Sequence, residues 1–175
     1  MKEAITRTIE IPEGVTVTVG DSIVVKGTNG ENSRVLTHPK ISITVEENKV
    51  KIHTKQGTKR EKKMIGTFNA LIKNMIKGAQ EPFVYTLKIC SGHFPMNVSV
   101  NNKKLVIKNF LGESVPRELR LLDNVDVSIN GEQIEVKSSS KELAGQTAGD
   151  IEQLCRIKQK DSRIFQDGCY ITSKA

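Results

Sequence analysis

The chain has 175 residues, of which 37% are apolar and 27% charged, with a formal net charge of +7 and three cysteines. Valine and isoleucine recur in regular patterns, so we expect a folded protein rather than a disordered basic tail, and no apolar run approaches the ~18 residues of a membrane span. The charged N-terminus argues against a signal peptide, the few cysteines argue against a disulfide framework and favour the cytoplasm, and the positive charge favours nucleic acid as a partner.

The first half of the chain begins with four extended segments. Residues 15–19 alternate Val with Thr, which is the period of a half-buried strand, and residues 23–26 form a second strand. Residues 41–45 and 50–52 alternate in the same way on either side of Glu46-Glu47-Asn48. This pair of segments predicts a hairpin.

A helix is predicted after the hairpin. Its apolar residues follow the spacing i, i+3, i+4, i+7, i+8 of an amphipathic helix, and Gly78 stands where a C-terminal cap would. The stripe consists of Phe68, Leu71, Ile72, Met75 and Ile76.

Five blocks of this pattern recur in the second half of the chain, in the same order and displaced by 82–84 residues. They are Val15–Val17 with Val98–Val100, Gly30-Glu31 with Gly112-Glu113, Ile41–Val45 with Val125–Ile129, Val50 and Ile52 with Ile134 and Val136, and Gly66, Phe68 and Leu71 with Gly149, Ile151 and Leu154. The repeat predicts one small domain, duplicated and joined near Ala79 to Pro82. We expect a first domain over 1–81 and a second over 82–175.

The second copy carries the same elements. Asn130-Gly131 stands at its hairpin position, where a type I′ turn needs positive φ at both central residues. Its helix stripe consists of Ala144, Ala148, Ile151, Leu154 and Cys155. The predicted fold class is therefore α+β, with two tandem duplicated domains that each pack a small antiparallel β-sheet against one α-helix.

Motifs of catalysis are absent from the sequence. It has no His-x-x-His or His-Glu-x-x-His pair, no glycine-rich phosphate loop and no G-x-S-x-G elbow. Ser91-Gly92-His93 is interpreted as a loop after a strand that ends at Cys90. We expect no catalytic residue, no metal and no cofactor, and Cys155 and Cys169 are expected to be buried thiols.

Cations gather in two clusters. From Lys49 to Lys63 there are seven cations and one acid, which suits either a solvated hairpin leading into a flexible loop or contact with phosphates. The second cluster begins where the second helix stripe ends, in a loop that precedes Asp167-Gly168, and runs from Arg156 to Lys174. Its cations are Arg156, Lys158, Lys160, Arg163 and Lys174. A basic loop held between a helix and a strand can present cations to phosphates, and Phe165 and Tyr170 could either stack on bases or cap the core.

The same stretch carries a resemblance to a known family. Gln153, Ile157, Lys160, Arg163, Phe165, Asp167-Gly168, Tyr170-Ile171 and Lys174 keep the spacing of a C-terminal family signature, with Cys169 where an aliphatic residue is usual. His93–Val98, Asn109–Glu113 and Asn74–Gly78 also match stretches typical of that family. The chain resembles ribosomal protein L-six of the large subunit, in its archaeal and eukaryotic form.

The resemblance implies a structural constituent of the large ribosomal subunit. It implies two tandem copies of a three-stranded sheet with a helix, and contact with large-subunit rRNA mainly through the second domain. It also implies a place near the stalk base and the sarcin–ricin loop, where translation factors dock beside neighbouring ribosomal proteins.

Candidate rRNA-binding residues follow from the signature and the charge. Lys158, Lys160, Arg163 and Lys174 are expected to contact phosphates, with Arg156 beside them. The loop that contains Asn109 and Gly112 is a second candidate, because glycine lets the backbone approach a phosphate or a base edge, and Arg117 adds charge next to it. The same loop could equally be a plain strand connection with Phe110 and Leu111 packed inward.

Two other functions compete with rRNA binding. A protein-interaction module would use the sheet edges of the duplicated domain to bind an acidic protein, without catalysis. A thiol enzyme would use Cys169 or Cys155, although nothing in the sequence requires such chemistry.

Overall fold

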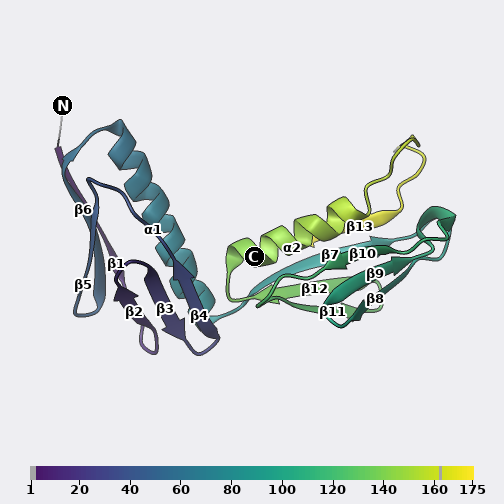
Figure 1. Cartoon of the computed structure of the whole chain (residues 1–175), viewed down its shortest axis with the longest axis horizontal. Coiled ribbons are helices and arrows are strands. Elements are labelled where there is room, and N and C mark those ends of the chain that lie inside the picture. The colour runs from purple at the N-terminus through teal and green to yellow at the C-terminus, as the bar shows by residue number, and fades with distance from the viewer. Residues whose placement is uncertain (1–2, 162) are drawn as a thin grey trace. The chain divides into compact units, whose positions relative to one another are not determined.

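The computed structural model describes residues 3–161 and 163–175, and the chain divides into two compact units, Met1–Pro82 and Phe83–Ala175. Each unit contains two antiparallel sheets and one long helix (Figure 1).

In the first unit, one sheet has the order β1-β6-β5 and the other the order β2-β3-β4. The strands are β1 (Glu3–Glu10), β2 (Thr16–Val19), β3 (Ile23–Gly27), β4 (Gly30–Arg34), β5 (Ser42–Glu46) and β6 (Lys49–Gly57). Helix α1 (Lys59–Gln80) packs against strands of both sheets and buries Ile65, Phe68, Ile72 and Ile76 against them. The core of this unit therefore lies between the helix and the two sheets.

The second unit repeats this plan with one strand more. Its sheets have the orders β11-β12-β7-β13 and β10-β9-β8, and helix α2 (Lys141–Leu154) lies along the larger sheet (Figure 1). The strands are β7 (Phe83–Cys90), β8 (Asn97–Asn101), β9 (Lys104–Lys108), β10 (Arg117–Arg120), β11 (Asp126–Asn130), β12 (Gln133–Ser138) and β13 (Gly168–Ser173). A short 3-10 turn at Phe110–Gly112 precedes β10.

The predicted α+β class is confirmed, as is the duplicated plan. The hairpins β5–β6 and β11–β12 have the same register, because Val45 faces Val50 as Ile129 faces Ile134. Each unit also carries a second sheet, which the sequence pattern did not distinguish from the first. No strand formed by the described residues of the first unit corresponds to β13.

One block of the sequence repeat is not equivalent in the structure. Gly30 faces Gly27 in the tight β3–β4 hairpin, whereas Gly112 lies in the longer connection between β9 and β10. The match of Gly30-Glu31 with Gly112-Glu113 was therefore wrong, because the second unit inserts residues at this connection.

Helix α1 begins at Lys59, before the first residue of the predicted stripe. Thr58 and Glu61 form a capping box, in which Thr58 N–H donates to the Glu61 carboxylate at 2.8 Å. The hydrogen bond from the Thr58 hydroxyl is the main cause that lowers the pKa of Glu61 to about 2. The basic residues from Lys59 to Lys63 therefore lie on the first turns of a helix, not in a flexible loop.

The end of α1 also differs from the prediction at Gly78. The helix continues through Gly78 to Gln80, so this glycine is not the C-terminal cap. The β3–β4 turn caps the helix instead: Asn29 N–H donates to the Ala79 carbonyl at 3.1 Å, and the Thr28 hydroxyl donates to the same oxygen at 3.4 Å. This contact brings the strand end at Gly27 against the helix.

Gly27 is required for that approach. A Cβ at Gly27 would lie 2.5 Å from the Ala79 carbonyl oxygen and 2.8 Å from the Ala79 Cβ. We expect Gly27→Ala to lower the free energy of unfolding by about 1–3 kcal/mol in urea titrations, because strand and helix must separate. Gly66→Ala is the matched control, since its Cβ meets nothing within 4 Å, and it should raise stability by up to ~1 kcal/mol. Equal effects of the two substitutions would contradict the packing argument.

Candidate nucleic-acid interface

The segment between α2 and β13, residues 156–167, is called here the basic segment. Both of its ends are fixed, because α2 packs on the larger sheet and β13 pairs with β7 along Gly168–Ser173. Arg156, Lys158, Lys160 and Arg163 are exposed along it, and Lys174 is exposed just after β13. The structure thus gathers four of the predicted cations on one segment and places Lys174 beyond the strand that follows it.

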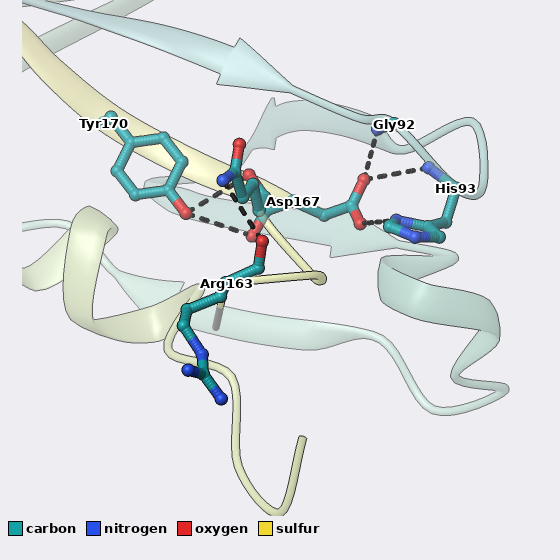
Figure 2. Close-up of polar contacts among 6 residues, drawn as sticks. Gly92, His93, Arg163, Asp167 and Tyr170 are labelled. Atoms are coloured by element: carbon teal, nitrogen blue, oxygen red, sulfur yellow. Dashed lines mark hydrogen bonds and ion pairs between the residues drawn. The ribbon is translucent and has the colours of Figure 1, made fainter. Parts of the chain in front are cut away.

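The Asp167 carboxylate holds the end of the basic segment on the loop that follows β7. It is buried, with 3% of its side chain exposed, and it accepts hydrogen bonds from the backbone N–H groups of Gly92 and His93. The ring Nδ1 of His93 lies 2.6 Å from the other carboxylate oxygen (Figure 2). Because a carboxylate can only accept, His93 Nδ1 carries the proton of this contact.

These contacts keep Asp167 ionised. Burial alone would raise the pKa of Asp167, but the hydrogen bonds from the His93 ring and from the two N–H groups outweigh burial and lower it below its usual value. A buried carboxylate with this many partners fixes the two loops relative to each other within the second unit.

Phe165 contacts one polar group of the β7–β8 connection and one of the basic segment. The His93 ring stacks on it with centroids 4.7 Å apart, and the Lys160 ammonium lies 4.7 Å from its centroid. Phe165 is half-buried, so the ring is engaged by protein groups and positions Lys160. Stacking of Phe165 on a base stays a prediction.

Tyr170 is placed at the start of β13 and remains 42% exposed. Its hydroxyl lies 3.2 Å from the carbonyl oxygen of Gln166 and 3.5 Å from that of Asp167 (Figure 2). The ring therefore lies beside the basic segment with part of its surface open to a ligand.

The cations of the basic segment differ in their partners. Arg163 forms an ion pair with Asp161 at 2.7 Å, and this hydrogen bond raises the pKa of Arg163. Within residues 3–161 and 163–175, no carboxylate forms an ion pair with Arg156, Lys158 or Lys160. A phosphate that binds Arg163 must displace Asp161. A phosphate that binds Arg156, Lys158 or Lys160 displaces no carboxylate of the described residues.

Arg117 is engaged inside the protein. Its guanidinium makes a bidentate pair with Glu113, with contacts of 2.6 and 2.8 Å, and lies 4.1 Å from the Phe110 ring centroid. Its Nη1 donates to the carbonyls of Leu154 at 2.7 Å and Arg156 at 3.1 Å. Arg117 therefore holds the end of α2, where the basic segment begins, and sequence reasoning had no signal for this contact.

The second candidate loop packs on the same β7–β8 connection. Asn109 has φ of 58° and donates its side-chain amide to the Pro95 carbonyl at 3.0 Å, and Gly112 has φ of 78° with its Cβ position 3.7 Å from the Phe94 ring. Phe110 is buried in the core. Residues 92–95 thus contact both candidate regions.

The cysteines lie in the core of the second unit. Cys155 and Cys169 are free and buried, with 4% and 1% exposed, as the sequence predicted. The hydrogen bond with Cys155 and burial raise the pKa of the Cys169 thiol. Neither thiol is placed for attack on a substrate, so this geometry gives the thiol-enzyme hypothesis no support.

The first basic cluster is partly paired. Lys49 lies 3.6 Å from Glu10, and Lys51 forms an ion pair with Glu46. Lys55, Lys59, Arg60, Lys62 and Lys63 are exposed at the end of β6 and on the first turns of α1. This surface is basic, but no loop of the first unit gathers cations between fixed ends as the basic segment does.

Two further kinds of site were sought in the described residues. They contain no group of three or more His, Cys, Asp or Glu side chains that could hold a metal ion. None of their helices combines the length and apolar character needed to cross a bilayer.

Comparisons with known proteins agree with this geometry. The family model described as "Ribosomal protein L6" matches residues 11–81 and 94–168. The chain is 46% identical to "Large ribosomal subunit protein uL6" of Methanosarcina mazei, over 100% of both chains. It is 45% identical to the protein of that name from Methanobrevibacter smithii, over 98% of this chain and 97% of the relative, and 41% identical to that of Archaeoglobus fulgidus, over 96% and 89%.

Asp167→Asn tests the buried carboxylate. The variant should lower the free energy of unfolding by about 1–3 kcal/mol at pH 7, because the buried hydrogen-bond acceptor loses its charge. The lowered pKa of Asp167 means that its contribution is present above the ~3.9 of an unfolded aspartate and is lost as the pH falls through the folded pKa. The difference from wild type should therefore shrink below about pH 3.9.

Asp123→Asn is the matched control for this substitution. Asp123 pairs with Lys103 at 2.8 Å, but both side chains are exposed, so its loss should leave the free energy of unfolding close to that of wild type at any pH. Urea unfolding of both variants between pH 3 and 7 measures the effect. A loss for Asp167→Asn that did not depend on pH would contradict the assigned charge.

Proposed function

The chain belongs to the ribosomal protein L6 family, whose members are structural ribosomal proteins and not enzymes, and on this premise we propose that it is a constituent of the large ribosomal subunit that binds large-subunit rRNA through its second unit. The printed names of the relatives support the place in the large subunit. The division of the chain into two compact units supports separate domains over 1–81 and 82–175.

One observation carries the proposal: the basic segment presents cations from a backbone that is fixed at both ends. A loop whose two ends are fixed loses less conformational entropy on binding than a free tail would, so more of its interaction with phosphates becomes affinity. Each phosphate that such a cation neutralises also releases condensed counterions from the RNA. The segment therefore suits a polyanion better than an acidic peptide, because an acidic peptide releases fewer counterions when it is bound.

We assign different roles to the predicted residues. Lys158, Lys160 and Arg156 contact phosphates directly, Arg163 does so by exchanging Asp161 for a phosphate, and Lys174 contacts the RNA beyond β13. Asn109 and Gly112 form a second contact, next to the exposed Phe94 ring. Arg117 is a positioning residue, because its donors are occupied by Glu113 and by the carbonyls at the end of α2.

The proposed location follows from the family resemblance. The second unit would lie near the stalk base and the sarcin–ricin loop, beside neighbouring ribosomal proteins, and would support the region where translation factors dock.

The rRNA contact is tested by changing Lys158, Lys160 and Arg163 together to Ala. Binding of a large-subunit rRNA fragment is measured across a salt series. The triple variant should lose affinity, and the slope of log K against log salt should fall by about two to three units, because three phosphate contacts are lost. Unchanged affinity would exclude the basic segment as the contact.

Three other cations of the second unit provide a charge-matched control. Lys103, Lys104 and Lys137 are paired with Asp123, Glu118 and Glu135 at about 3 Å. Their joint substitution by Ala removes the same charge from strand surfaces and their borders. The slope should change by less than about one unit, and a loss as large as in the first triple variant would mean that only net charge matters.

Arg117→Met separates positioning from contact. It should lower the free energy of unfolding by about 1–3 kcal/mol and weaken rRNA binding, while the salt slope stays within about half a unit of wild type. Lys158→Met should leave the free energy of unfolding within about 0.5 kcal/mol of wild type, and it should lower the salt slope by about 0.7–0.9. Equal slopes for the two variants would contradict the assigned roles.

A further inference from the structure

The outer edge of β1 in the first unit has no strand beside it. In the sheet β1-β6-β5, one edge of β1 pairs with β6, and none of the strands formed by residues 3–161 and 163–175 pairs with the other. This edge spans eight residues, and a row of N–H and C=O groups along such an edge is a template for another strand. We call it the open edge.

The duplicated plan shows what a strand at this position looks like. Ile9 faces Val50 on the central strand of its sheet, as Leu87 faces Ile134 on the equivalent strand of the second unit. Thr8, Ile9 and Glu10 therefore correspond to Thr86, Leu87 and Lys88. In the second unit those residues pair with Ser173, Ile171 and Tyr170 of β13, so the equivalent place in the first unit lacks its strand.

A groove lies along the open edge at this same place. It is lined by Thr8, Ile9 and Glu10 of β1 and by Lys73, Ile76, Lys77 and Gln80 of α1. Helix α2 likewise packs against both β7 and β13. The groove is thus lined by a strand and a helix, β1 and α1, just as β13 contacts a strand and a helix, β7 and α2, in the second unit.

We propose that the open edge and this groove bind an extended segment of another protein, which adds antiparallel to β1 as β13 adds to β7. That the partner is a protein of the large subunit rests on the proposed function. The edge offers C=O as well as N–H groups, so it suits a polypeptide backbone, which carries both donors and acceptors, better than a phosphate chain, which carries acceptors.

The lining indicates the side chains of the partner. In β13, Cys169 and Ile171 pack into the core of the second unit, so the added segment should carry apolar residues at alternate positions, facing Ile9 and Ile76. Lys73 and Lys77 are exposed one helical turn apart on the rim of the groove. The partner segment should therefore carry an acidic side chain opposite them.

A second copy of this chain fits the edge less well. Antiparallel pairing of β1 with itself along its full length would place Glu3 opposite Glu10 at both ends. Like charges directly opposite each other destabilise a strand pair, so self-pairing is disfavoured.

Hydrogen exchange of the wild-type chain tests whether the open edge is covered. Amides of β1 should exchange at least about tenfold more slowly in purified large subunits than in the free protein. A chain that sediments with the large subunit but shows unchanged exchange in β1 overturns this inference alone. A chain that does not sediment with the subunit overturns the proposed function.

Photocrosslinking then identifies what covers the edge. Thr8→benzoylphenylalanine should form an adduct with a polypeptide in the subunit, whereas the control Thr44→benzoylphenylalanine, exposed on the far edge strand of the same sheet, should not. Lys73→Glu should lower the yield at position 8 by about fivefold, and Lys63→Glu, on α1 but outside the groove lining, should leave it unchanged. An adduct with rRNA or with a second copy, or no adduct, overturns the inference.

Discussion

The burial of one carboxylate, that of Asp167, sets the geometry of the candidate interface. A buried charge is tolerated only with hydrogen-bond partners, and here the partners come from a loop more than 70 residues earlier in the chain. The same residue is the last of the basic segment and directly precedes the first residue of β13. Its contacts therefore fix where the segment ends, where the strand begins and how His93 meets Phe165.

The two units have the same register in their hairpins and differ in the residues that follow their helices. Helix α1 has 22 residues and α2 has 14, and the second unit uses the following residues for the basic segment and β13. A shorter helix thus leaves room for two features, a loop that carries cations and a strand that covers the sheet edge. The described residues of the first unit, with its longer helix, form neither feature, and β1 is an edge strand among them.

Periodic features of the fold were predictable from sequence, and contacts between distant residues were not. The apolar residues of the hairpins and of the helix stripes recur with a clear period, so the α+β class and the duplication could be predicted from the sequence. Strand β1 was missed because its only large apolar side chains are Ile5 and Ile9, four residues apart. The start of α1 was missed although Thr58 and Glu61 have capping-box spacing. The hydrogen bonds from Arg117 to the carbonyls at the end of α2 and those to the Asp167 carboxylate join residues 37–75 positions apart. No local sequence pattern predicts such pairs.

The distribution of partners explains how a unit with a small charge excess can present a basic surface. Several cations on the strands of the second unit and at their ends face carboxylates, as Lys103 faces Asp123 and Lys104 faces Glu118. A phosphate that approached them would have to displace a carboxylate and would gain little. On the basic segment, Arg156, Lys158 and Lys160 have no such competitor among the described residues, so a phosphate gains the full interaction. In the function proposed here, the preference for the basic segment comes from where the acids are placed, and the local field matters more than the total charge.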